Sequence, residues 1–143
     1  MKLDPNVWGP HYWFFLHTVS LTYPNRPNDV IKKKYYDLIM NFHLFIPTES
    51  ASSNFNELLG LYPVTPYLDS RDAFIRWVYF IHNKMNKKLE KPQIKLSTFY
   101  ENYYQQYKNK DISLKEYYKY INKYIYLAFI IILIAFIYYL YNK

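Results

Sequence analysis

The chain contains no cysteine, and only two of its 143 residues are glycine. The absence of cysteine excludes disulfides, thiolate metal ligands, iron–sulfur clusters and a cysteine nucleophile. The scarcity of glycine argues against barrels, loop-rich folds and a glycine-rich phosphate loop. Hydrophobic residues make up 51% of the sequence, which is too many for a disordered chain. We therefore expect one domain rich in long helices, with a short appendage.

Recognisable catalytic or metal-binding motifs are also missing. The four histidines, His11, His17, His43 and His82, show no spacing typical of metal ligands, so we predict no metal site. No nucleophile-elbow pattern is present, although the sequence alone leaves a Ser-His-Asp arrangement open. The formal charge of +7 would suit nucleic acid, but no basic stripe or nucleic-acid motif accompanies it, so we expect no such partner.

The last twenty residues form a distinct segment. Residues 124–141 carry no charge, proline or glycine, and as a helix they would span about 27 Å, close to the apolar thickness of a bilayer. A buried core helix is the alternative, but a helix that is apolar all round needs a large protein around it. We therefore predict a C-terminal membrane anchor. Five lysines precede it and one follows, which predicts that the N-terminal part faces the cytosol: Lys108, Lys110, Lys115, Lys119, Lys123 and Lys143.

Hydrophobic periodicity and capping residues predict an all-α bundle of four helices with a short fifth. The predicted helices are 6–22, a second that begins after Asn28 or Asp29 and ends near Phe45, a third from Pro47 to Leu59, 71–89, and 97–107. Gly60 is the expected C-cap of the third helix, and Ser70 is the expected start of the fourth. The fourth pattern is the strongest, with apolar residues at Phe74, Trp77, Val78, Ile81 and Met85. We divide the chain into a bundle (1–107), a basic segment (108–123) and an anchor (124–141).

Aromatic, histidine and amide side chains recur on the first and fourth of these helices. They are Trp8, Trp13 and His17, then Trp77, His82, Asn83 and Asn86. Such a set would suit a flat heteroaromatic ligand that carries phosphates, because rings stack and amides bond ring edges. The same residues would equally serve as packed core, and periodicity alone favours that interpretation.

The spacing of these residues resembles a known family. Trp8-Gly9-x-x-x-Trp13-x-x-Leu16-His17, and later Trp77-x-x-x-x-His82-Asn83-x-Met85-Asn86-x-x-Leu89-x-Lys91-Pro92, are similar to the ERV/ALR family of FAD-linked sulfhydryl oxidases. The resemblance covers roughly residues 6–107. It implies a four-helix bundle with a short fifth helix, usually a homodimer, that holds FAD at the mouth of the bundle.

The resemblance also implies a set of FAD-binding residues. Trp8, Gly9, Trp13 and His17 would line the flavin or adenine, and His82, Asn83 and Asn86 would contact the rings. Lys88 and Lys91 would approach the ribose and phosphates, and Tyr103 would lie near the adenine. Two positions depart from the family, since Pro10 stands where many members have arginine and Ile46 where many have tyrosine.

A third departure concerns the family's catalytic Cys-x-x-Cys, which follows a proline at the start of the third helix. Thr48 and Ala51 occupy the two cysteine positions here. The residues therefore imply that the cofactor site is kept and the dithiol relay is lost, because neither side chain undergoes thiol exchange. The resemblance extends to oxidases of large DNA viruses, which implies a virion membrane as one location.

Three hypotheses remain open from the sequence. The first is a non-catalytic, FAD-binding homologue that pairs with itself, a related oxidase or a thiol-bearing protein at a membrane. The second is a flavin oxidase whose substrate acts without a protein dithiol. The third is a cofactor-free, membrane-tethered interaction module in which the aromatic residues are only core.

Overall fold

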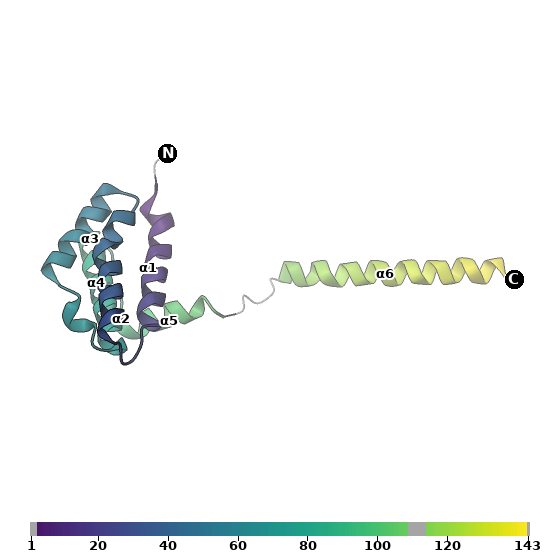
Figure 1. Cartoon of the computed structure of the whole chain (residues 1–143). Helices are drawn as coiled ribbons and strands as arrows, with labels where there is room; N and C mark the ends of the chain where they lie inside the picture. Colours follow the sequence, from purple (N-terminus) through teal and green to yellow (C-terminus); the bar gives the residue numbers. More distant parts are fainter. Residues whose placement is uncertain (1–2, 109–113, 143) are drawn as a thin grey trace. The chain divides into compact units, whose positions relative to one another are not determined.

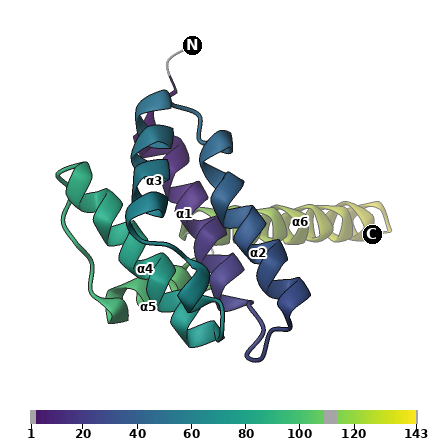
Figure 2. The ribbon, with the colours of Figure 1, turned by 60° about the vertical axis from the view of Figure 1, so that its left-hand side comes forward.

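The computed structural model describes residues 3–108 and 114–142, and all of its regular elements are helical. Their bounds are α1 Pro5–Leu21, α2 Asp29–Asn41, the 3₁₀ helix η1 Phe42–Phe45, α3 Glu49–Leu61, the 3₁₀ helix η2 Thr65–Tyr67, α4 Arg71–Lys88, α5 Leu96–Gln105 and α6 Leu114–Tyr141. The chain divides into two compact units, with the boundary in the sequence between Gln106 and Tyr107. In the first unit α1–α4 lie side by side and α5 crosses one end of them (Figures 1 and 2). The all-α prediction is therefore confirmed.

Side-chain caps explain where three of the helices begin. The Asp4 side chain accepts a hydrogen bond from the backbone N–H of Asn6, so α1 begins at Pro5, one residue before the predicted start. The Asn28 side chain accepts a hydrogen bond from the backbone N–H of Ile31 at 2.9 Å. Asn28, rather than Asp29, is therefore the N-cap of α2. Ser70 caps α4 as predicted. Such a cap contributes about 1 kcal/mol to helix stability.

Several predicted helix ends are wrong. Helix α3 continues through Gly60 to Leu61, and Tyr62 caps it, so Gly60 is not the C-cap. The φ angle of Gly60 is not positive, so the position does not need glycine. Pro47 is not the first residue of α3 either, because Thr48 is the N-cap. Residues 42–45 form a 3₁₀ turn rather than the end of α2.

The core of the first unit lies along α4. All five predicted apolar positions of α4 are buried, and they pack against α1, α2 and α3. Burying side chains of this size contributes roughly 1.5–3 kcal/mol each. The principal partners from the other elements are Leu16, Ile39, Phe55, Leu58, Leu59 and Val64. This packing fixes α1 against α4, the two helices on which the ring-bearing residues lie.

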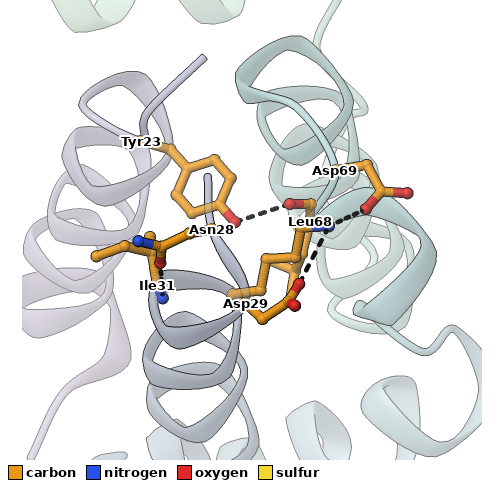
Figure 3. A network of polar contacts seen from close by, with 7 residues as sticks. Tyr23, Asn28, Asp29, Ile31, Leu68 and Asp69 are labelled. Atoms are coloured by element: carbon orange, nitrogen blue, oxygen red, sulfur yellow. Dashed lines mark hydrogen bonds and ion pairs between the residues drawn. The ribbon is translucent and has the colours of Figure 1, made fainter. Parts of the chain in front are cut away.

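A polar network joins the turn after α1 to the segment before α4 (Figure 3). The hydroxyl of the fully buried Tyr23 donates to the carbonyl of Leu68 at 2.8 Å, and the Arg71 guanidinium donates to the carbonyl of Tyr23. Lys32 forms an ion pair with Asp69 at 2.7 Å and a looser one with Asp29 at 4.0 Å. Because both carboxylates are largely exposed, we assign the stabilisation mainly to the buried tyrosine.

The second unit contains the apolar helix α6, which has 28 residues. A 21-residue stretch of it, Ile121–Tyr141, contains an 18-residue window with a mean hydropathy of 2.3, and none of that window is buried in protein. Its length of about 31 Å matches a bilayer core. Of the predicted basic segment, residues 109–113 and the side chains of Lys115 and Lys119 lie outside the described residues.

Candidate functional site

A cavity of about 850 Å³ opens between α1, the start of α3, the end of α4, and α5. That size is within the range of small-molecule and cofactor sites. The sequence-predicted residues that line it are Trp8, Gly9, Trp13, His17, Thr48, Ala51, His82, Asn86, Lys91 and Tyr103. Pro10 and Ile46, which depart from the family pattern, line it as well. Asn83 and Lys88 are not among its lining residues, and Trp77 is packed in the core with its indole N–H bonded to the Tyr62 carbonyl.

Two histidines meet at the inner wall of the cavity. Nε2 of His17 lies 3.2 Å from Nδ1 of His82, so one ring donates a hydrogen bond to the other. The Trp13 ring stacks on His82 with centroids 4.0 Å apart and planes 12° apart. The ring of Phe99, on α5, packs edge-to-face with the ring of His17, and their centroids are 4.5 Å apart. The first and fourth helices thus bring three predicted site residues into one stack of rings.

Both histidines of this pair are held in the neutral form. Burial, with a smaller contribution from the neighbouring His82, lowers the pKa of His17 from 6.5 to about 3. Burial also lowers the pKa of His82, to about 4, with a second contribution from the positive charge of Lys91. At neutral pH this wall therefore presents ring faces and one internal hydrogen bond, with no net charge.

Trp8 carries a buried polar atom without a partner. Its indole N–H makes no hydrogen bond with any described residue, although the ring packs edge-on against Tyr12 at 5.2 Å. A buried donor left unpaired costs about 1–3 kcal/mol. Because Trp8 lines the cavity, an acceptor on a bound ligand would remove this cost.

A Schellman motif at the end of α4 brings Lys91 to the cavity. The backbone N–H of Lys91 donates to the carbonyl of Asn86 at 2.8 Å, and the backbone N–H of Glu90 donates to the carbonyl of Lys87 at 3.2 Å. Glu90 takes the left-handed conformation that this turn requires, with a φ of 55°. The Lys91 ammonium then reaches Asn6 at the start of α1, 3.1 Å away. A cation is thereby held at the rim of the ring-lined cavity.

The three remaining predicted residues of α4 differ in what they do. Asn86 lines the cavity, is 8% exposed, and its carboxamide makes no hydrogen bond with the described residues. Asn83 instead directs its carboxamide at the backbone of Ile94. Lys88 pairs with Glu57 of α3 at 2.8 Å. Thus Asn86 alone of the three presents free polar atoms to the cavity.

The start of α3 contributes small side chains to the cavity. Thr48 is the N-cap, but its hydroxyl makes no capping hydrogen bond, and Ala51 is 9% exposed. Ser50 lines the cavity between them. No sulfur other than that of methionine is present in the chain, so none of these residues offers a thiolate. Within the described residues, no group of three or more histidines or acids is placed to hold a metal ion.

The cavity wall formed by α5 was largely missed from the sequence, where only Tyr103 was predicted. Phe99, Asn102, Tyr103 and Gln106 all line the cavity. Their spacing of three, four and seven residues is that of one helix face, and this signal was available in the sequence. Tyr103 is also fixed by its hydroxyl, which lies 3.1 Å from that of Thr18.

Comparison with known proteins gives consistent results. The model of the Erv1 / Alr family matches residues 10–108. The FAD-linked sulfhydryl oxidase of African swine fever virus, isolate Pig/Kenya/KEN-50/1950, is 31% identical over 99 residues, which cover 69% of this chain and 81% of that protein. A probable FAD-linked sulfhydryl oxidase of Acanthamoeba polyphaga mimivirus is 33% identical over 85 residues, 59% of each chain.

A solved structure agrees with the fold. The FAD-binding domain of Erv1 from Saccharomyces cerevisiae superposes with a TM-score of 0.64 at 27% identity, covering 71% of this chain and 95% of that one. The match to the full mitochondrial FAD-linked sulfhydryl oxidase ERV1 of the same yeast spans only 49% of that protein. The similarity therefore concerns the helical bundle.

Proposed function

The chain belongs to the Erv1/Alr family, and from that premise we propose that its helical bundle binds FAD in the α1–α3–α4–α5 cavity but does not itself oxidise thiols. Disulfide chemistry at this site then depends on a partner that brings its own thiols. FAD, when bound, supplies a two-electron acceptor that can be reoxidised by oxygen.

The chemistry of the cavity supports FAD as the ligand. The stack of Trp13 on His82 offers flat faces to a ring system, and the neutral histidines offer hydrogen bonds without a charge. Lys91 supplies a cation for phosphate at the rim. The observation that carries the proposal is the unpaired indole N–H of Trp8, a buried donor in the cavity wall for which the described residues supply no acceptor.

The absence of cysteine supports the second half of the proposal. Thr48 and Ala51 line the cavity at the start of α3, where the resemblance places the two catalytic cysteines. A hydroxyl and a methyl group accept no electrons from a dithiol, so these side chains provide no relay. A homodimer would not restore it, because every copy lacks cysteine.

The visible absorption spectrum of the full chain, purified in mild detergent, tests FAD binding. We expect a flavin band at close to one FAD per chain, and no oxygen consumption with dithiothreitol. A folded helical protein that stays colourless when FAD is added would refute the proposal. Rapid oxygen consumption would instead show direct reduction of the flavin by small thiols, which is the second hypothesis of the sequence analysis.

A matched pair of tryptophan variants sharpens this test. Trp8→Phe keeps an aromatic ring and removes the unpaired N–H, so we expect FAD to bind about tenfold more weakly, the equivalent of one hydrogen bond to a charged or polar acceptor. Trp77→Phe removes an N–H that already bonds Tyr62 outside the cavity, so the FAD affinity should stay unchanged although the fold is less stable. Equal losses in both variants would contradict the assignment.

We also propose that α6 anchors the chain in a membrane, with the N-terminal unit on the cytosolic side. The uncharged residues 124–141 and the excess of lysine before them support this orientation. Relatives from mimivirus and African swine fever virus support a membrane of the assembling virion as its location.

Alkaline carbonate extraction of membranes tests the anchor. The unsubstituted chain should remain in the membrane pellet, whereas Ile131→Lys with Ile134→Lys should release it, because each central lysine costs about 3 kcal/mol. Asn142→Lys adds a charge outside the apolar stretch and is the matched control, which should remain anchored. Extraction of the unsubstituted chain would contradict anchoring.

A further inference from the structure

Three side-chain hydrogen bonds hold a single residue of the connector between α4 and α5. The carboxamide nitrogen of Asn83 donates to the Ile94 carbonyl at 2.9 Å, and the Asn83 oxygen accepts the Ile94 amide at 2.9 Å. The hydroxyl of Tyr79, one turn earlier on α4, donates to the same carbonyl at 2.9 Å. Both peptide groups of Ile94 are thus bonded to one face of α4.

This arrangement matters because few side chains of the connector and α5 are buried. Along α5 only Phe99 and Tyr103 are buried. Most of residues 89–95 are exposed, and Ile94 is the one that is partly buried. Beyond the Schellman turn at Glu90, the hydrogen bonds from Tyr79 and Asn83 therefore determine the path by which the chain returns to the bundle.

The connector and α5 also form one wall of the cavity. Ile94, Phe99 and Tyr103 all line it, opposite the residues of α1. A shift of Ile94 would move this wall relative to the His17–His82 pair, since the rings of Phe99 and His17 are in contact, with their centroids 4.5 Å apart. Asn83 is 9% exposed, does not line the cavity, and influences it only through Ile94.

We propose that Asn83, assisted by Tyr79, is a positioning residue that fixes the α5 wall and thereby sets how long a ligand stays in the cavity. This differs from the direct ring contact that the family resemblance implied for Asn83. The structural part of the inference stands on the hydrogen bonds alone, and only its effect on FAD rests on the proposed function.

Hydrogen–deuterium exchange of the full chain without FAD tests the structural part. Asn83→Leu keeps the approximate side-chain volume and removes two of the three bonds, so exchange in residues 89–105 should accelerate at least about tenfold while α1–α3 change little. Tyr79→Phe removes one bond and should accelerate the same segment less. Lys84→Leu is the matched control, because Lys84 lies over the Tyr62 and Phe80 rings instead of near Ile94. Unchanged exchange in 89–105, or acceleration spread evenly over all helices, would overturn the proposal.

FAD binding kinetics of the same variants test the functional part. We expect the dissociation rate to rise about tenfold in Asn83→Leu, with the association rate within about twofold, because a loosened wall holds the ligand for less time. Accelerated exchange with unchanged FAD dissociation would overturn the role in binding. If the unsubstituted chain binds no FAD, the proposed function fails, and the exchange experiment still decides whether Asn83 fixes the wall.

Discussion

Two histidines that share one hydrogen bond make the free energy of unfolding depend on pH. The folded chain keeps His17 and His82 neutral, with pKa values lowered to about 3 and about 4, whereas the unfolded chain protonates both near 6.5. The unfolded state therefore binds more protons below pH 6.5, so stability is complete above that value and falls as the pH decreases toward about 4. We expect a loss of roughly 2 kcal/mol per histidine by pH 5.

Urea unfolding of the full chain at several pH values measures this effect. His82→Gln should remove about half of the acid-induced loss, because one of the two titrating groups is gone. His11→Gln replaces an exposed histidine of α1 and should leave the pH dependence as it is in the unsubstituted chain. A free energy of unfolding that is flat between pH 7 and 5 would contradict the burial of the pair as neutral groups.

Restoring two cysteines should restore the missing relay. Thr48 and Ala51 are the N-cap and third residue of α3, and both line the cavity. A helix N-terminus lowers the pKa of a thiol, which favours the reactive thiolate. We expect Thr48→Cys with Ala51→Cys, loaded with FAD, to consume oxygen with dithiothreitol, and either single variant to remain at background.

A second pair with the same spacing provides the control for that experiment. Ser53→Cys with Asn56→Cys also places two thiols three residues apart on α3, but both positions are exposed and neither lines the cavity. This variant should bind FAD and consume no oxygen above background. A double variant at 48 and 51 that binds FAD and is still inactive would show that more than the dithiol has been lost.

Most of the candidate site was predictable from residue type and spacing, but the direction of individual side chains was not. Trp13, His17 and His82 line the cavity as the motif implied. Asn83 and Lys88 fit the same motif and yet bond Ile94 and Glu57. Those partners lie 11 and 31 residues away in the chain, so no local pattern indicates them.

Helix existence was predictable from periodicity, whereas helix ends depended on backbone conformation. The apolar pattern of α4 predicted its buried face correctly, because burial follows the helical period directly. The sequence predicts Gly60 as the end of α3, yet Gly60 lies inside that helix, and the one left-handed residue among the described residues is Glu90. A glycine permits a left-handed cap without requiring one, and a Schellman turn can form around another residue.

That left-handed glutamate predicts a stabilising substitution at the end of α4. Glu90 adopts a φ of 55°, a conformation that costs a residue with a Cβ about 1 kcal/mol relative to glycine. Glu90 makes no ion pair with the described residues. We expect Glu90→Gly to raise the free energy of unfolding by about 0.5–1 kcal/mol, measured by urea unfolding. Lys87→Gly, inside the last turn of α4, should lower it by a similar amount. Destabilisation by Glu90→Gly would show that its side chain has another role.

The first unit as a whole exposes apolar side chains along α1 and η1. Val7, Phe15, Leu44 and Phe45 are 66%, 47%, 66% and 67% exposed. The two elements are in contact, since the hydroxyl of Tyr12 donates to the Phe45 carbonyl and Phe15 stacks on Phe42. Exposed apolar side chains on two elements in contact are typical of an interaction site. We expect a second copy of the chain to cover it, as the family resemblance implies.

Sedimentation of the full chain in density-matched detergent tests this dimer. The unsubstituted protein should sediment as a dimer, and Phe15→Glu should yield monomers, because two opposed carboxylates would have to lose water inside an apolar interface. Leu61→Glu adds the same charge at an exposed leucine at the far end of α3 and should stay dimeric. If both variants and the unsubstituted chain are monomeric, α1 and η1 must be covered by a different protein, and the related oxidase becomes the partner to test by adding it to the same sample.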